Sequence, residues 1–186
     1  KTTVVPMKLE KGECVFVVFR ETGKPMLHSV EANYPSPVLI QNVQNIWDVT
    51  FESAFKNPSP IKMDILQDLA TMANDSVKYF SGTATYKTNV DLKKASKGER
   101  MFINFDKVGA MGKVYINGKY AGGVWTIPYQ LDVTDFVKNG MNEIKVEVVN
   151  TWVNRIVGDL NAPEGERQVY CFINPHRPDS PLPASG

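Results

Sequence analysis

Apolar and polar residues alternate with a period of two along much of the chain. Residues 47–52 read Trp-Asp-Val-Thr-Phe-Glu, so their apolar side chains fall on one face of an extended strand and their polar ones on the other. Residues 61–65 and 144–148 repeat this pattern. It is typical of antiparallel strands with one buried and one solvated face. We therefore predict three half-buried strands here.

Two further segments predict strands of other kinds. Residues 14–19 form a continuous apolar run, which predicts a strand covered on both faces. Residues 79–90 are rich in Thr and Tyr, which favour strands, and Gly82 within them marks a bulge or a close backbone approach. Residues 101–105 predict another short strand.

Turn signals separate these segments, and helical signals are few. Asn117-Gly118 stands between two apolar runs and predicts a tight hairpin, because a type I′ turn needs positive φ at both central residues. Thr134 is placed to cap a single helical turn over residues 135–137. Residues 66–73 show short helical spacing. Together, the many strand and turn signals and the few helical ones predict an all-β fold, an antiparallel β-sandwich.

Breaks in the pattern predict three parts. Gly23-Lys24-Pro25 and the Pro-Ser-Pro of residues 35–37 interrupt the first part, so residues 1–44 are predicted to be the end of a preceding β segment and a connection. Residues 45–173 hold the sandwich. Residues 174–186 form a tail rich in Pro and Ser.

Charge excludes several partners. The 21 Lys and Arg balance 20 Asp and Glu, so no basic face for nucleic acid or an acidic membrane surface is predicted. No apolar run approaches the length of a membrane span. The chain opens on Lys1 without an initiator Met, which suggests the interior of a longer protein. Cys14 and Cys171 predict either two separate thiols or one disulfide, and with His28 and His176 they form no zinc pattern.

Two stretches resemble a known family. Residues 77–86 read Val-Lys-Tyr-Phe-Ser-Gly-Thr-Ala-Thr-Tyr, and residues 114–125 read Val-Tyr-Ile-Asn-Gly-Lys-Tyr-Ala-Gly-Gly-Val-Trp. Followed by Asn-Thr-Trp-Val-Asn-Arg from residue 150, they resemble the C-terminal jelly-roll domain of family 106 glycoside hydrolases, the α-L-rhamnosidase type. The middle part is also similar to the sugar-binding domain of family 2 glycosidases. The resemblance covers roughly residues 45–160.

The resemblance implies a galactose-binding-like jelly roll attached to a separate catalytic barrel, in a periplasmic or extracellular enzyme. It places the paired catalytic carboxylates in that barrel, so no catalytic residue is predicted in this chain. The family pattern continues past a Ser-Gly like Ser185-Gly186 into an apolar strand, which implies either that one sheet lacks a strand or that the last strand has been removed.

The chain's own carboxylates fit solvated faces, caps and turns better than acid–base chemistry. The two histidines lack a Ser or Cys nucleophile context, so no triad is predicted. The carboxylates concerned are Asp48, Glu52, Asp64, Asp68, Asp106, Asp132, Asp135 and Asp159.

Sugar binding needs aromatic faces that stack on the C–H side of a pyranose and planar groups that bond its hydroxyls. Trp125, Tyr129 and Trp152 fit the first role, and Asn154, Arg155 and Asp159 fit the second. In the structural alternative, the aromatic residues cover one end of the sandwich, and Arg155 pairs with Asp159.

No cofactor is predicted. Residues 57–59 and 161–166 are the best loops for a structural calcium ion, and neither has the density of oxygen ligands that calcium needs. The predicted partners are the parent's catalytic barrel and an oligosaccharide. Three functions stay open: an accessory domain of a glycoside hydrolase, a stand-alone carbohydrate-binding module, and a protein-interaction sandwich.

Overall fold

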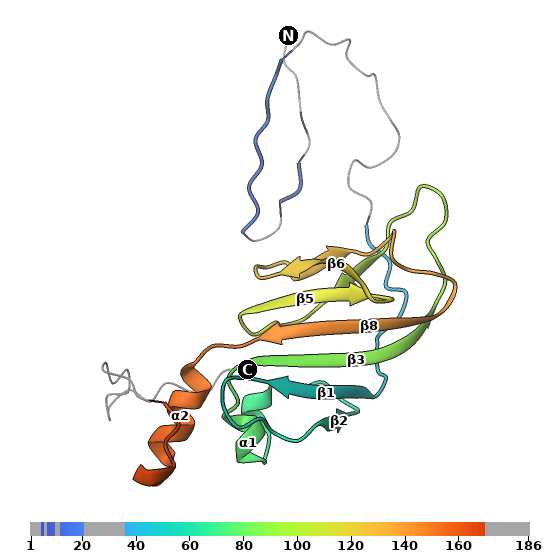
Figure 1. Ribbon diagram of the computed structural model, residues 1–186. Helices are drawn as coiled ribbons and strands as arrows, with labels where there is room; N and C mark the ends of the chain where they lie inside the picture. The colour runs from blue at the N-terminus through green and yellow to red at the C-terminus, as the bar shows by residue number, and fades with distance from the viewer. Residues whose placement is uncertain (1–4, 6, 10–11, 21–35, 170–186) are drawn as a thin grey trace. The chain divides into compact units, whose positions relative to one another are not determined.

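The computed structural model describes residues 5, 7–9, 12–20 and 36–169 (Figure 1). The chain divides into two compact units, residues 1–42 and 43–186. In the first unit, the described residues form no helix or strand. All strands and helices of the described residues therefore belong to the second unit.

One sheet has six antiparallel strands, and a second has two. The six lie in the order β2 (Ile61–Met63), β1 (Trp47–Glu52), β3 (Thr83–Leu92), β8 (Gly140–Val149), β5 (Met111–Ile116) and β6 (Lys119–Val124). The two-stranded sheet pairs β4 (Phe102–Asn104) with β7 (Gln130–Asp132). The helical segments are η1 (Leu69–Thr71), α1 (Asp75–Lys78), α2 (Val153–Asn161) and η2 (Glu164–Glu166).

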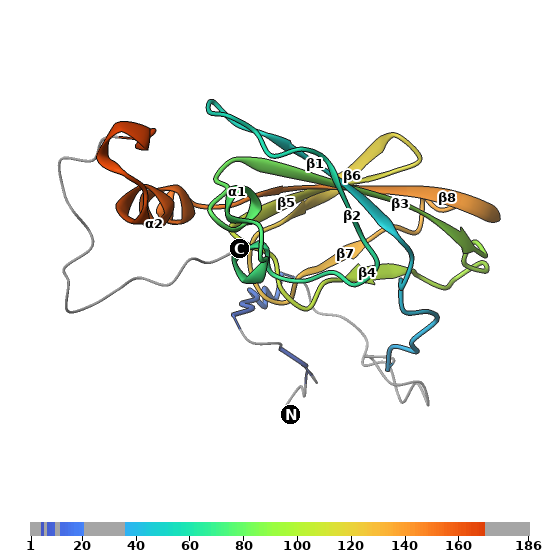
Figure 2. The same ribbon diagram turned by 90° about the horizontal axis from the view of Figure 1, so that it is seen from below.

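The core lies between these two layers. Figure 2 shows β4 and β7 on one side of the six-stranded sheet. Alternate residues of the large sheet point to that side, and Val49, Val90, Val114 and Val146 are among its most deeply buried side chains. The residues between them face the other side, which we call the outer face. The all-β antiparallel sandwich predicted from the alternation is confirmed.

The hairpin prediction is also confirmed. Asn117 and Gly118 join β5 to β6 with φ values of 53° and 77°. Gly82 has the predicted close approach, because a Cβ atom there would collide with the backbone oxygen of Glu52 and lie 2.9 Å from the Phe80 ring.

Other predictions were wrong in detail. Residues 14–19 form no strand, and their apolar side chains are exposed, with Phe16 94% exposed. Apolarity alone therefore did not correctly predict a strand in this segment. The strand predicted over residues 61–65 ends at Met63, which leaves Ile65 exposed.

The two predicted helical turns also differ from the structure. Residues 66–73 contain only the short η1, because Asp68 accepts a hydrogen bond from the Ala70 amide and starts the helix there. The turn after β7 is capped by Asp132 instead of Thr134, since the Asp132 carboxylate accepts from the Thr134 amide.

Candidate functional site

The residues predicted to bind sugar gather at one end of the large sheet. The register pairs Gly112 of β5 with Val148 of β8 and Val124 of β6, so β6 and β8 end together. Trp125 follows β6 directly, and α2 begins shortly after β8 and leaves the sheet at that end (Figure 1).

Side-chain hydrogen bonds hold the start of α2 against the segment that enters β3. Asn150 accepts from the Gly82 amide at 2.9 Å and donates to the Phe80 carbonyl at 2.7 Å. Ser81 donates to the Thr151 carbonyl and accepts from the Arg155 amide, both at 2.9 Å. Residues about 70 positions apart therefore fix where α2 begins.

Inside this arrangement, Arg155 and Asp159 pair across one turn of α2 at 2.8 Å. The other Asp159 oxygen accepts from the amides of Gln168 and Val169 at 2.9 and 2.7 Å. Asn154 and Asp159 are buried. The structure thus shows the pairing of the structural alternative, and these groups fasten α2 and the segment after it.

The aromatic candidates are more accessible. Trp125 is 71% exposed and Trp152 is 59% exposed, with the Trp152 ring edge-on to Phe55 at 5.8 Å. Tyr129 is half-buried, and its carbonyl accepts from the Phe105 amide at 2.9 Å. Of the predicted residues, Trp125 and Trp152 are therefore the most exposed.

Sequence reasoning missed a second polar and aromatic group, on the outer face of the large sheet. Lys145 donates to Glu147 at 2.7 Å, and its ammonium lies 3.8 Å from the centre of the Tyr115 ring. The Tyr115 hydroxyl donates to the other Glu147 oxygen at 3.3 Å. Tyr120 packs on Tyr115 with ring centres 5.4 Å apart. The two tyrosines and the Lys–Glu pair are neighbours across β6, β5 and β8.

Each member of the Lys145–Glu147 pair favours the charged form of the other. The hydrogen bond to Glu147 raises the pKa of Lys145 above its usual value, and burial acts in the opposite direction. The hydrogen bond from Lys145 lowers the pKa of Glu147, again against burial. In the sequence, Tyr115, Lys145 and Glu147 occupy the outward-facing positions of the period-two pattern. Alternation alone does not distinguish such a group from an ordinary solvated face.

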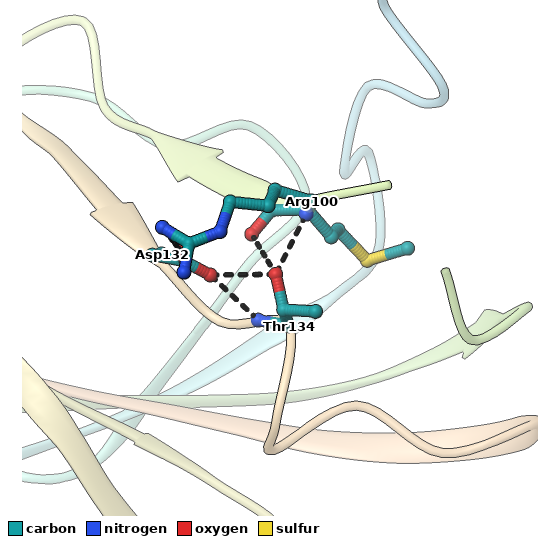
Figure 3. A network of polar contacts seen from close by, with 4 residues as sticks. Arg100, Asp132 and Thr134 are labelled. Atoms are coloured by element: carbon teal, nitrogen blue, oxygen red, sulfur yellow. Dashed lines mark hydrogen bonds and ion pairs between the residues drawn. The ribbon is translucent and has the colours of Figure 1, made fainter. Parts of the chain in front are cut away.

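A third polar network joins two segments of the fold. Asp132 accepts from the Thr134 hydroxyl at 2.6 Å and the Thr134 amide at 3.0 Å, and it pairs with Arg100 at 3.0 Å (Figure 3). The Thr134 hydroxyl oxygen accepts from the Met101 amide at 2.9 Å. These contacts join the segment before β4 to the turn after β7. The bonds from Thr134, followed by the charge of Arg100, lower the pKa of Asp132, while burial opposes them.

Other carboxylates also have structural partners. Asp48 pairs with Lys62 at 2.6 Å, and Asp68 pairs with Lys107 at 2.9 Å. Within the described ranges, no group of three His, Cys, Asp or Glu side chains is placed to hold a metal ion. Helices of the described part are all too short or too polar to cross a membrane.

Several predictions concern residues outside the described ranges. Cys14 is described and exposed, but Cys171 is not, so the question of a disulfide stays open. His28, His176 and the predicted tail over residues 174–186 also lie outside the described residues.

Comparisons with known proteins agree on the type of domain. The family model for the sugar-binding domain of family 2 glycosyl hydrolases matches residues 12–160. A protein of Formosa agariphila named "Putative beta-glucuronidase" is 35% identical over 144 residues, which is 76% of this chain and 12% of that protein.

Solved structures share the fold. A rhamnosidase from Novosphingobium sp. PP1Y is 34% identical with a TM-score of 0.71, and the match covers 79% of this chain and 14% of that one. A β-glucuronidase from an uncultured Clostridium shares the fold at 20% identity and a TM-score of 0.50, over 59% of this chain and 22% of that one. The chain therefore spans a small part of the proteins that it matches.

Proposed function

Because the chain belongs to the family of sugar-binding domains found in family 2 glycosyl hydrolases, we propose that it is a non-catalytic accessory domain of a larger glycoside hydrolase. The observation that carries this proposal is the family match over residues 12–160 together with the small share, 12% and 14%, of the two relatives that the chain spans. In such an arrangement, the catalytic carboxylates belong to another domain of the parent.

The parent that we favour is an enzyme of the α-L-rhamnosidase type, as in family 106, that acts in the periplasm or outside the cell and carries this domain toward its C-terminal side. Supporting this choice are the 34% identity and the TM-score of 0.71 to a rhamnosidase, alongside the motif order of residues 77–86 and 114–125. A β-glucuronidase-like parent is the alternative, favoured by the similarity to the Formosa agariphila protein.

The absence of catalysis is tested with the purified 186-residue chain and aryl glycosides, a rhamnoside and a glucuronide. We expect no turnover above the buffer rate. Glycoside hydrolysis needs two carboxylates that flank the scissile bond, whereas the Asp48, Asp132 and Asp159 carboxylates are all engaged with cations or backbone amides of the fold. Turnover that disappears on Asp132→Asn or Asp159→Asn would overturn the proposal.

Within the accessory role, we propose that the domain binds carbohydrate through Trp125, with Trp152 nearby at the same end of the sheet. An exposed indole is a stacking surface for a sugar ring, and Trp125 is 71% exposed. Calorimetric titration with oligosaccharides should show binding by the wild-type chain and its loss in Trp125→Ala. An unchanged melting temperature assigns Trp125 to the ligand, whereas a lowered melting temperature with unchanged affinity assigns it to the structure.

A protein-docking role has its own observation. Residues 14–19 are apolar yet exposed, with Phe16 94% exposed, and surfaces of this kind mark contacts with other proteins. If this segment packs on the catalytic barrel, Phe16→Asp in the full-length parent should lower the thermal stability of the barrel. An unchanged barrel stability would contradict docking through this segment.

A further inference from the structure

The outer face of β6 has a gap in its side chains where the backbone does not need one. Gly122 and Gly123 are neighbours, but only Gly122 is required by the fold: its φ is 150°, and a Cβ atom there would lie 2.7 Å from Leu131. At Gly123, φ is outside the left-handed region, and a Cβ atom would meet only ordinary contacts, at 3.4 Å from the Tyr120 hydroxyl and 3.5 Å from the Gly112 carbonyl. The backbone conformation therefore does not require glycine at 123, and the Tyr120 hydroxyl lies beside the place that a side chain there would take.

Gly123 stands between two exposed aromatic residues in the sequence, Tyr120 and Trp125. The register of β5 and β6 shifts between Val114 and Tyr115, and Ala121 is the extra residue. The shift puts Tyr120, opposite Tyr115, on the same outer face as Gly123, although three positions separate them. Trp125 is two positions after Gly123, so an extended backbone would direct both to the same face. Tyr120 is 56% and Trp125 71% exposed, and the Tyr120 hydroxyl lies beside the Gly123 position, so two accessible rings belong to this stretch of β6 and the residue that follows it.

The length of this surface suits an extended ligand. Tyr120 pairs with Tyr115, and Val124, the neighbour of Trp125, pairs with Gly112. Gly112 and Tyr115 are three positions apart in β5, which corresponds to about 10 Å of backbone. The backbone positions of Tyr120 and Trp125 are therefore farther apart than the length of a single sugar ring.

Polar groups beside Tyr120 are held in fixed positions. Tyr115 packs against Tyr120 and donates to Glu147, and Lys145 bonds the same carboxylate while lying over the Tyr115 ring. Both charged side chains are 24% exposed. Each side chain therefore has exposed surface that can bond a sugar hydroxyl group, and the opposite charges of Lys145 and Glu147 offset each other. Groups fixed before binding lose little conformational entropy when a ligand arrives.

We propose that an extended, uncharged oligosaccharide binds along the outer face of β6, with its rings stacked on Trp125 and Tyr120, its middle over Gly123 and its hydroxyls bonded by Lys145 and Glu147. This inference rests on the proposed sugar-binding role and deepens it, because it assigns the ligand to the sheet face instead of the surface of α2. Trp152 then takes no part in binding.

The test is affinity electrophoresis of the 186-residue chain in native gels that contain hydroxyethyl cellulose, arabinogalactan or polygalacturonate. We expect an uncharged polymer to retard the wild type. Tyr120→Ala should weaken binding by about tenfold or more, as for an aromatic anchor of an interface, and Tyr120→Phe should retain most of it. Gly123→Thr should abolish retardation while keeping the melting temperature, since Thr suits a strand and the site has room for a side chain.

The matched controls are Trp152→Ala and Lys119→Thr, a substitution at an exposed position of the same strand, and both should bind as the wild type does. If Trp152→Ala loses binding while Tyr120→Ala and Gly123→Thr do not, the sheet-face assignment is wrong and the sugar-binding role stands. Retardation by polygalacturonate alone would contradict an uncharged ligand. If no polymer retards the wild type, the sugar-binding proposal and this inference fail together.

Discussion

At the scale of single residues, many of the described polar side chains form hydrogen bonds or ion pairs that join distant segments of the chain. Asn150 joins the end of β8 to the Phe80–Gly82 backbone, and Asp159 gathers Arg155 and two later amides. The sequence predicted that Arg155 and Asp159 bind sugar hydroxyls or pair with each other. It could not decide between these alternatives, because the partners of Asp159 and Asn150 are brought together only by the fold.

Asp132 gives a prediction at this scale. Its folded-state pKa is lowered, so its contribution to stability is present above the usual value of 3.8 and is lost as the pH falls through the lower folded value. We expect Asp132→Ala to lower the free energy of unfolding by about 1 kcal/mol at pH 7, as for loss of a capping side chain. The loss should shrink as the pH falls below the folded pKa.

Urea unfolding at pH 7 and at a series of lower pH values that ends below the folded pKa of Asp132 measures this effect, with Asp135→Ala, an exposed neighbour in the same turn, as the control. A loss for Asp132→Ala that is equally large at a pH where the wild-type carboxyl is protonated would show that the charge of Asp132 plays no part.

At the scale of elements, alternation predicted the strands well and the segments at their ends poorly. The burial of Trp47, Val49 and Phe51 follows directly from the period of two. Helix α2 was missed because its local signals are weak: Trp152 provides no side-chain cap, and Gly158 lowers helix propensity. Its position depends on Ser81, about 70 residues earlier. The apolar run over residues 14–19 was wrongly predicted to be a strand, because a strong hydrophobic signal does not by itself form one.

Gly158 tests how tightly α2 packs. A Cβ atom there would lie 2.7 Å from the Cβ of Tyr79 and 2.7 Å from an Arg155 nitrogen. In an open helix, Gly→Ala adds up to about 1 kcal/mol of stability. Here we expect Gly158→Ala to destabilise by about 1–2 kcal/mol, because overpacking outweighs that gain. Gly165→Ala, with no neighbour within 4 Å, should leave the calorimetric melting temperature unchanged. A stabilised Gly158→Ala variant would show that α2 packs loosely.

At the scale of the whole chain, the division into two units predicts independent stability. Every buried apolar residue of the described part lies between Trp47 and Val146, so the core formed by the described residues belongs to the second unit. The exposed run at residues 14–19 combines strand-forming residues with no charge, a composition that favours intermolecular pairing. We therefore expect a chain that begins at Val43 to keep the urea midpoint of the full chain and to self-associate less.

Sedimentation over a concentration series, with urea unfolding of the same samples, measures both effects. Phe16→Asp in the full chain is the matched control, because it adds charge to the run and removes no residue. It should reduce self-association as truncation does and leave the midpoint unchanged. A midpoint that falls on truncation but not in Phe16→Asp would show that residues 1–42 contribute to the stability of the sandwich through contacts other than the apolar run. Unaltered self-association in both variants would show that the exposed run does not drive pairing.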